Sequence, residues 1–186
     1  MTYSEIVSFD DELLILVDEN DTILGYESKA VCHQGEGILH RAFSIFIFDH
    51  FDRLILQQRS EQKFLWPLYW SNSCCSHPRK GESLDIAAQR RLEEELGIKT
   101  KLKYLYSFRY QAKYQDLGSE NELCAVLIGR SNIAPKINKN EIAEWKYIHP
   151  DELSVDIEKN SQRYTPWFKM EWQKISSEYM NDIKDL

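Results

Sequence analysis

The feature that most constrains this chain is a helix whose start, apolar face and end are all visible in the sequence. Ser83 is a typical N-cap residue, and Gly97 is a typical residue to end a helix. Between these two ends, apolar side chains recur at every fourth position, at Leu84, Ala88, Leu92 and Leu96. One face of this helix must therefore pack against another layer of the protein.

Segments typical of β-strands lie on both sides of this helix. Residues 12–17 and 23–26 enclose an acidic turn and predict a hairpin, and residues 41–48 and 54–58 predict a second hairpin. Later strands are expected at residues 99–110, 122–129 and 144–148. Strands that surround a central helix predict an α/β (α+β) fold with a mixed sheet.

Two further helices are expected outside the sheet. A short helix covers residues 27–32, and a closing helix runs from Thr165 to about Lys184 with Pro166 in its first turn. The loop at residues 71–82, which leads into the central helix, is expected to carry the functional site. No linker or repeat divides the sequence, so we expect one domain over residues 1–186.

The composition limits the classes of partner. A chain of 186 residues with 42% hydrophobic content can bury a sizeable core. Its formal net charge of -7 opposes nonspecific binding to nucleic acid and to anionic membrane surfaces. A phosphate-bearing small molecule would therefore have to be bound by a few placed cations. No motif indicates an interface between copies, and we expect a monomer.

The cysteines and the apolar segments indicate a cellular compartment. The cysteines are Cys32, Cys74, Cys75 and Cys124, and no Cys-x-x-Cys pair is present. This usage does not predict a disulfide framework. The first ten residues lack the features of a secretory signal, and the apolar run at residues 13–17 is too short to span a bilayer. We therefore expect a soluble, cytoplasmic protein.

A thiol and an imidazole occur close together in residues 70–78, at Cys75 and His77. A free cysteine is most often a small buried hydrophobic residue, and Cys74 fits that interpretation. Alternation along a strand would send the Cys74 and Cys75 side chains to opposite faces, so that one packs and the other enters a cleft. Only a thiol beside charged groups is expected to be reactive.

Imidazoles and carboxylates of several segments suggest a metal site. His33, His40 and His77 come from separate segments. Glu120 and Glu122 occupy alternate positions of a strand and point to one face. Each histidine taken singly is more often a polar loop residue, but the combination favours a site for Zn²⁺ or Mn²⁺. A purely structural zinc site is less favoured, because its ligands usually lie at short spacings.

The charged residues of the central helix and its flanks resemble the Nudix box, the metal and diphosphate site of that superfamily. The matching residues are Glu82, Arg90, Leu92, Glu94, Glu95, Gly97 and Ile98. Two positions differ, because Ser76 replaces the first Gly of the box and Arg91 replaces its Glu after Arg. A run of Glu alone also fits a solvated helix with salt bridges. Loss of the box Glu argues against ordinary diphosphate hydrolysis.

Taken together, the motifs resemble the type I isopentenyl-diphosphate isomerases of the Nudix superfamily. The resemblance runs from about Leu14 to about Met170. Its segments are residues 39–44, 70–78, 108–110, 120–122 and 166–167. It implies a Nudix-like mixed-sheet α/β/α sandwich that isomerises isopentenyl diphosphate to dimethylallyl diphosphate in isoprenoid biosynthesis. A Nudix hydrolase of a diphosphate-containing small molecule is the alternative enzyme, and a noncatalytic metal or nucleotide sensor is the alternative of another class.

The resemblance also implies roles for four side chains in the reaction. Cys75 corresponds to the catalytic thiol and Glu122 to the catalytic carboxylate, placed on opposite faces of the substrate. Tyr110 corresponds to the hydroxyl that assists Glu122, and Trp167 to the indole that faces the reacting carbons. An indole face stabilises a desolvated cation by roughly 2 kcal/mol, which suits a reaction through a tertiary carbocation.

Two metal sites and a diphosphate site follow from the same resemblance. The implied ligands of a tightly held Zn²⁺, Mn²⁺ or Mg²⁺ are His33, His40, His77, Glu120 and Glu122. Glu95 corresponds to the ligand of a Mg²⁺ that is shared with the substrate diphosphate. The cations implied to grip that diphosphate are Lys29, Arg59, Lys63 and Arg91. These cations would supply the local positive charge that an acidic chain needs for such a small-molecule substrate.

Overall fold

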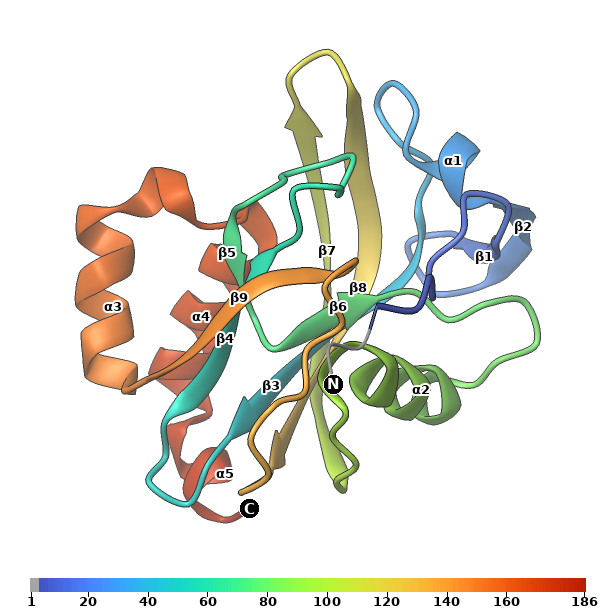
Figure 1. The fold of residues 1–186 in the computed structure, drawn as a ribbon. Coiled ribbons are helices and arrows are strands. Elements are labelled where there is room, and N and C mark those ends of the chain that lie inside the picture. Colours follow the sequence, from blue (N-terminus) through green and yellow to red (C-terminus); the bar gives the residue numbers. More distant parts are fainter. Residues whose placement is uncertain (1–3) are drawn as a thin grey trace.

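The computed structural model describes residues 4–186, and strand β3 (His40–Phe48) is the central element of its sheet (Figure 1). Residues 1–3, which belong to the start expected to lack a signal sequence, lie outside the described part. β3 runs parallel to β8 (Gly118–Arg130) over its full length and antiparallel to the short strand β6 (Cys74–Ser76). β3 therefore brings β6 and β8 together, and both carry predicted site residues.

Two hairpins extend this centre. The remaining strands are β1 (Leu13–Val17), β2 (Ile23–Ser28), β4 (Leu54–Arg59), β5 (Trp70–Ser71), β7 (Leu102–Tyr114) and β9 (Ile142–Ile148). β1 and β2 form the predicted first hairpin. β7 pairs antiparallel with β8 in another, longer hairpin. β4 pairs with β9 and β5. The mixed sheet that the sequence predicts is thereby confirmed.

Helices cover both faces of the sheet, as Figure 1 shows. They are α1 (Lys29–Cys32), α2 (Leu84–Leu96), α3 (Pro150–Lys159), the 3₁₀-helix η1 (Ser161–Arg163), α4 (Pro166–Glu178) and α5 (Met180–Lys184). Alternate β3 residues pack in two separate clusters: Phe43 lies with Leu92 of α2, and Phe46 stacks on Phe168 of α4. The α/β/α sandwich is confirmed. No helix among residues 4–186 combines the length and apolar character that a membrane crossing needs.

Both predicted ends of the central helix are confirmed in α2. The Ser83 side chain accepts a hydrogen bond from the backbone N–H of Ile86, which satisfies one of the free donors of the first turn. Gly97 ends the helix with φ at 64°, a left-handed conformation that glycine adopts without steric cost. Leu92 and Leu96 are fully buried against the sheet. These local signals agree with the tertiary packing, and the helix therefore starts and ends where the sequence predicts.

The closing helix and the preceding segment differ from the prediction. The chain breaks at Tyr179 into α4 and α5, because Tyr179 leaves helical geometry and stacks on Tyr106 with ring centroids 5.2 Å apart. This turn buries Ile183 against the core. Helix α3 was not predicted, although Pro150 at its start and Lys159 in its last turn are typical end signals.

The hairpin predicted for residues 41–48 and 54–58, which lie in β3 and β4, forms only at its tip. β3 and β4 pair at Phe48 and Leu54 and then diverge. The Ser73 side chain lies in the gap, where its hydroxyl accepts from the Ile47 N–H at 2.8 Å and donates to the Ile55 carbonyl at 2.6 Å. A fully buried side chain therefore replaces a backbone pair between these strands. The segment that follows it is β6, so this bridge positions Cys75.

We predict that Ser73→Ala destabilises the fold, because it leaves a buried N–H and a buried carbonyl without partners. The expected loss in the free energy of unfolding is about 2 kcal/mol. Chemical denaturation of the variant measures it. Ser177→Ala, at an exposed position of α4, is the control and should change stability very little. Equal stability of the two variants would show that the bridge contributes nothing.

Candidate active site

Five potential metal ligands meet at one end of the sheet. They are His33, His40, His77, Glu120 and Glu122, and their ligand atoms all lie within 4.8 Å of one another. Four of the five residues are buried, and His77 is partly exposed. These are the five residues that the family resemblance assigns to one ion, and the fold brings all of them together. We call them the ligand cluster.

Strand register explains how residues so far apart in sequence reach this point. His40 on β3 lies directly beside Glu122 on β8 in the parallel ladder. Glu120 lies two residues earlier and therefore points to the same face. His33 approaches from α1, and the Ser119 N–H donates to its carbonyl at 2.9 Å. Gly118 allows this approach, because a Cβ atom there would lie 2.4 Å from the His33 carbonyl oxygen.

Hydrogen bonds set the orientation of the imidazole rings. His33 Nδ1 lies 2.7 Å from the Lys29 carbonyl, and His40 Nδ1 lies 2.7 Å from the Ile38 carbonyl. A carbonyl can only accept, so Nδ1 carries a proton in both rings, and Nε2 of each ring faces the cluster. His40 Nε2 is buried and has no hydrogen-bond partner among residues 4–186. This orientation is the one that a metal ion requires.

The electrostatics of the cluster also fit a cation. Burial, assisted by His33, lowers the pKa of His40 to about 4, and burial with His40 lowers the pKa of His77 well below its usual value. Burial also opposes ionisation of Glu120, but His33 outweighs it and lowers the Glu120 pKa to about 2. At His33, by contrast, Glu120 outweighs burial and raises the pKa. Imidazoles whose neutral form is favoured, as in His40 and His77, are donors for a divalent ion beside a carboxylate. The ligand cluster could therefore hold a metal ion.

A cavity of about 520 Å³ opens beside the ligand cluster. Cys75, Glu122, Tyr110 and Trp167 all line it, so the structure brings the four predicted reacting residues together. The Tyr110 hydroxyl donates to Glu122 Oε2 at 2.5 Å. Burial, reinforced by Glu120, raises the pKa of Glu122 well above its usual value. Glu122 is thus a weaker acid than an ordinary glutamic acid, which suits a group that donates a proton.

The two adjacent cysteines occupy different environments, as strand alternation predicts. Cys74 is fully buried in the apolar cluster beneath α2, whereas Cys75 is partly exposed and faces the cavity. Burial raises the pKa of Cys75 to about 12, against the opposing effect of Arg59. Arg59 Nη1 lies 3.8 Å from Cys75 Sγ. The cavity therefore presents a thiol with one guanidinium beside it.

Trp167 is positioned by the start of α4. Pro166 occupies the first turn of that helix, and Trp167 follows it with only 3% of its surface exposed. Its ring packs edge-on against Trp66 at 5.2 Å and has the Arg59 guanidinium over its face at 5.3 Å. Tyr110 lies 6.1 Å away. These contacts hold the indole as a rigid wall of the cavity.

Cations gather in the part of the cavity lined by Lys29, Lys63 and Arg91. Glu141, which the sequence analysis missed, pairs with Lys63 and accepts from Arg91 Nη2 at 3.0 Å. Opposing charges bring its pKa to about 2 although it is buried. An acidic residue immediately before a strand carries no sequence signal of such a role. Only the tertiary fold identifies Glu141 as the carboxylate that organises these cations.

Arg59 and Glu95, both predicted site residues, already have hydrogen-bond partners within the protein. Arg59 lines the cavity but donates to the backbone carbonyls of Leu65 at 2.8 Å and Trp66 at 3.0 Å. Several of its donors are therefore used within the protein. Glu95 is buried outside the ligand cluster, where its Oε1 accepts from Arg91 Nη2 at 2.6 Å. Glu95 was assigned to a different ion from the ligand cluster, and it lies apart from that cluster in the structure.

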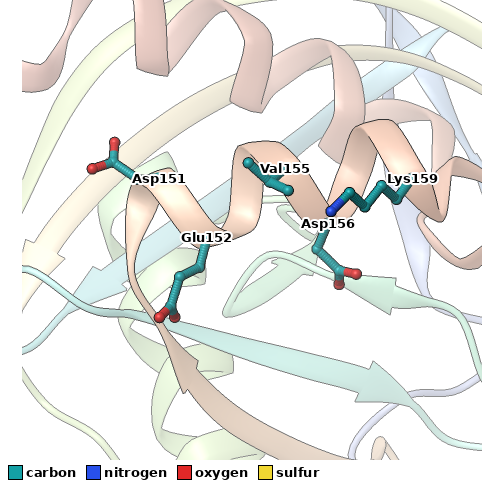
Figure 2. A pocket seen from close by; sticks show the side chains of 5 residues that line it. All are labelled: Asp151, Glu152, Val155, Asp156 and Lys159. Atoms are coloured by element: carbon teal, nitrogen blue, oxygen red, sulfur yellow. The ribbon is translucent and has the colours of Figure 1, made fainter.

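A second depression lies on the outer surface of α3. Figure 2 shows the side chains that line it: Asp151, Glu152, Val155, Asp156 and Lys159. None of them belongs to the ligand cluster or lines the cavity beside it. This surface is therefore separate from the site.

Comparisons with known proteins agree with the fold and the site. The NUDIX domain model matches residues 38–168, so the architecture defines a NUDIX domain protein. Crystal structures support the fold: a Deinococcus radiodurans protein has a TM-score of 0.67 at 24% identity and covers 80% of this chain and 90% of its own. A MutT protein from Methanosarcina mazei has a TM-score of 0.64 at 14% identity and covers 76% and 96%.

Relatives with higher identity narrow the class. Isopentenyl-diphosphate Delta-isomerase 1 of Photorhabdus laumondii is 42% identical over 174 residues, which cover 92% of this chain and 99% of the relative. The isopentenyl-diphosphate Delta-isomerase of Serratia proteamaculans is 44% identical over 158 residues, which cover 85% and 88%. The chain belongs to the isopentenyl-diphosphate Delta-isomerase family.

We predict that the purified protein retains about one tightly bound divalent ion per chain after dialysis, because protein atoms alone supply the ligands. His40→Ala should lose this ion, since it removes a buried nitrogen that has no hydrogen-bond partner among the described residues. Elemental analysis measures the metal content. His50→Ala is the control, because His50 lies outside the ligand cluster. Equal metal content in both variants would contradict the assignment.

Proposed function

We propose that this chain interconverts isopentenyl diphosphate and dimethylallyl diphosphate by adding one proton and removing another, a 1,3-allylic shift of the double bond. The observation that carries the proposal is the shared cavity, in which Cys75 and Glu122 both face the space beside Trp167. Family membership supports the same reaction. The substrate is a small isoprenoid diphosphate.

The reaction proceeds through a tertiary carbocation, which water would capture. We propose that Glu122, assisted by the Tyr110 hydroxyl, donates a proton on one face of the substrate. Cys75 removes a proton on the other face, and Arg59 beside its sulfur favours the thiolate that this step needs. The carbocation lies against the Trp167 ring, whose quadrupole stabilises positive charge where water is excluded. No covalent intermediate is required.

The metal ions have separate roles in this proposal. The residues of the ligand cluster would hold one Zn²⁺, Mn²⁺ or Mg²⁺. A divalent ion bound there supplies positive charge that fixes Glu122 and lowers the pKa values of groups beside it. Glu95 would be a ligand of a Mg²⁺ that arrives with the diphosphate, and this role requires Glu95 to release Arg91.

Binding of the diphosphate is assigned to the cationic part of the cavity. We propose that Lys29, Lys63 and Arg91 contact the phosphate oxygens. Arg59 completes this group in our proposal, although part of its guanidinium is held by the backbone. Glu141 competes with the phosphate for two of these cations, so substrate must displace some of its contacts. Before substrate binds, the ion pairs with Glu141 compensate part of the positive charge of Lys63 and Arg91.

Other properties of the chain are part of the proposal. We propose a single domain over residues 1–186, because both apolar clusters share the central strand β3. We propose a monomer, since one chain supplies every assigned site residue, and a cytoplasmic location, since the cysteines are free. The net charge of -7 supports the absence of nucleic-acid and membrane partners.

We predict that Cys75→Ala abolishes isomerisation, lowering kcat by at least about a thousandfold, because it removes one of two acid/base groups. A coupled assay with isopentenyl diphosphate and Mg²⁺ measures the dimethylallyl product. Cys74→Ala is the matched control and should keep substantial activity, since Cys74 does not face the cavity. Equal losses would contradict the assignment. Release of phosphate without isomerisation by the wild type would indicate the alternative Nudix hydrolase.

We predict that Trp167→Leu lowers kcat far more than Trp167→Phe does, because Phe keeps an aromatic face and Leu keeps only apolar bulk. KM should change little in either variant, since only the transition state carries the developing positive charge. Steady-state kinetics and the affinity for a positively charged amine analogue measure the two effects. Equal activity and equal amine binding in both variants would make Trp167 a packing residue.

A further inference from the structure

Glu171 is a buried carboxyl that the mechanism above does not use. It lies on α4 one turn after Trp167 and is 1% exposed. Ser44 and Cys124 hydrogen-bond to its carboxyl group, with Cys124 Sγ 3.6 Å from Glu171 Oε1. Its other oxygen, Oε2, has no hydrogen-bond partner within residues 4–186. A buried oxygen without a partner is costly, so this position requires an explanation.

Ser44, Cys124 and Glu171 form a polar layer in the core on the cavity side of the sheet. Cys124 Sγ lies 3.5 Å from Ser44 Oγ. Ser44 lies directly opposite Cys75 in the β3–β6 ladder, which places both side chains on one face of the sheet. Cys124 follows Glu122 by two residues on β8 and shares its face. Ser44 and Cys124 therefore lie on the same face as both acid/base groups, and with Glu171 they extend into the core beneath α4, where neighbouring side chains are apolar.

The isomerisation itself creates a need for such a layer. In each turnover the substrate gains one proton at the terminal carbon and loses one from the carbon on the other side. One group of the protein is left without its proton, and the other is left with an extra one. The number of protons on the protein does not change overall. One proton must nevertheless move from the group that gained it to the group that lost it before the next turnover. The substrate fills a cavity with buried aromatic walls, which restricts return through water while the ligand is bound.

We propose that Glu171 stores and returns this proton through Ser44 and Cys124, an inference that rests on the isomerase activity proposed above. An O–H bond forms on the Glu171 carboxylate as the proton arrives and breaks as it leaves. The Ser44 hydroxyl can donate and accept, and it connects the carboxyl to the Cys75 side. Cys124 connects it to the Glu122 side. Glu171 is a positioning and storage residue, because it does not touch the substrate.

The surroundings of Glu171 suit this role. Burial raises its pKa to about 7, so the carboxyl can take up and release a proton near neutral pH. Three strands supply the groups that contact Glu171. Ser44 of β3 and Cys124 of β8 contact its carboxyl group. The Tyr106 hydroxyl of β7 donates to its backbone carbonyl at 3.4 Å. No cation is hydrogen-bonded to the carboxyl within the described chain, so no ion pair holds it in the charged form.

The test separates the first turnover from later ones. The wild type, Glu171→Gln and the control Glu178→Gln are assayed with isopentenyl diphosphate, first with enzyme in excess and then with substrate in excess. Glu178 is an exposed carboxylate of the same helix. For Glu171→Gln we expect a single-turnover rate within about twofold of the wild type and a steady-state kcat about tenfold lower. Glu178→Gln should match the wild type in both.

Two further variants keep the test decisive if Glu171→Gln folds poorly. Ser44→Ala interrupts the layer and should show the same split between the two rates, whereas Glu171→Asp keeps a titratable group and should recover part of the steady-state rate. Equal falls in both rates would reduce Glu171 to a structural residue and overturn the inference, as would unchanged rates in every variant. A wild type that does not isomerise the substrate would instead overturn the proposed function.

Discussion

The parallel pairing of β3 with β8 is the interaction on which the rest of the structure depends. It aligns His40 with Glu122 and thereby brings a ligand from each strand to the same end of the sheet. The same strand pairs on its other edge with β6, which carries Cys75. A shift of one residue in either register would turn these side chains to the opposite face. The ladder therefore sets the ligand cluster and the reacting pair together.

Burial of charge is the second organising principle, and the molecule handles it differently in each part of the cavity. In the ligand cluster, burial keeps His40 neutral and leaves its Nε2 available to an ion. In the cationic part, Glu141 compensates Lys63 and Arg91 until a diphosphate replaces it in our proposal. Within residues 4–186 no cation pairs with the Glu171 carboxyl, and burial instead favours its neutral form. Each solution suits a different chemical task.

Local signals predicted those elements whose own residues agree with their packing. Helix α2 is the clearest case, because Ser83, its apolar stripe and Gly97 all act within one segment. The opposite orientations of Cys74 and Cys75 follow from alternation and were predicted for the same reason. The break at Tyr179 was not, because its partner Tyr106 lies on a distant strand. The divergence of β4 from β3 depends on Ser73, which is also remote in sequence.

The sequence by itself determined which chemical groups the site contains and which family the chain resembles, because residue types and their order are properties of the chain alone. It could not determine that Glu141 would compensate the cations or that Glu171 would lie beneath Cys124, since ordinary acidic residues carry no local mark of burial. Those outcomes depend on distances between segments far apart in the chain, and only the packing of helices on both faces of one sheet sets such distances.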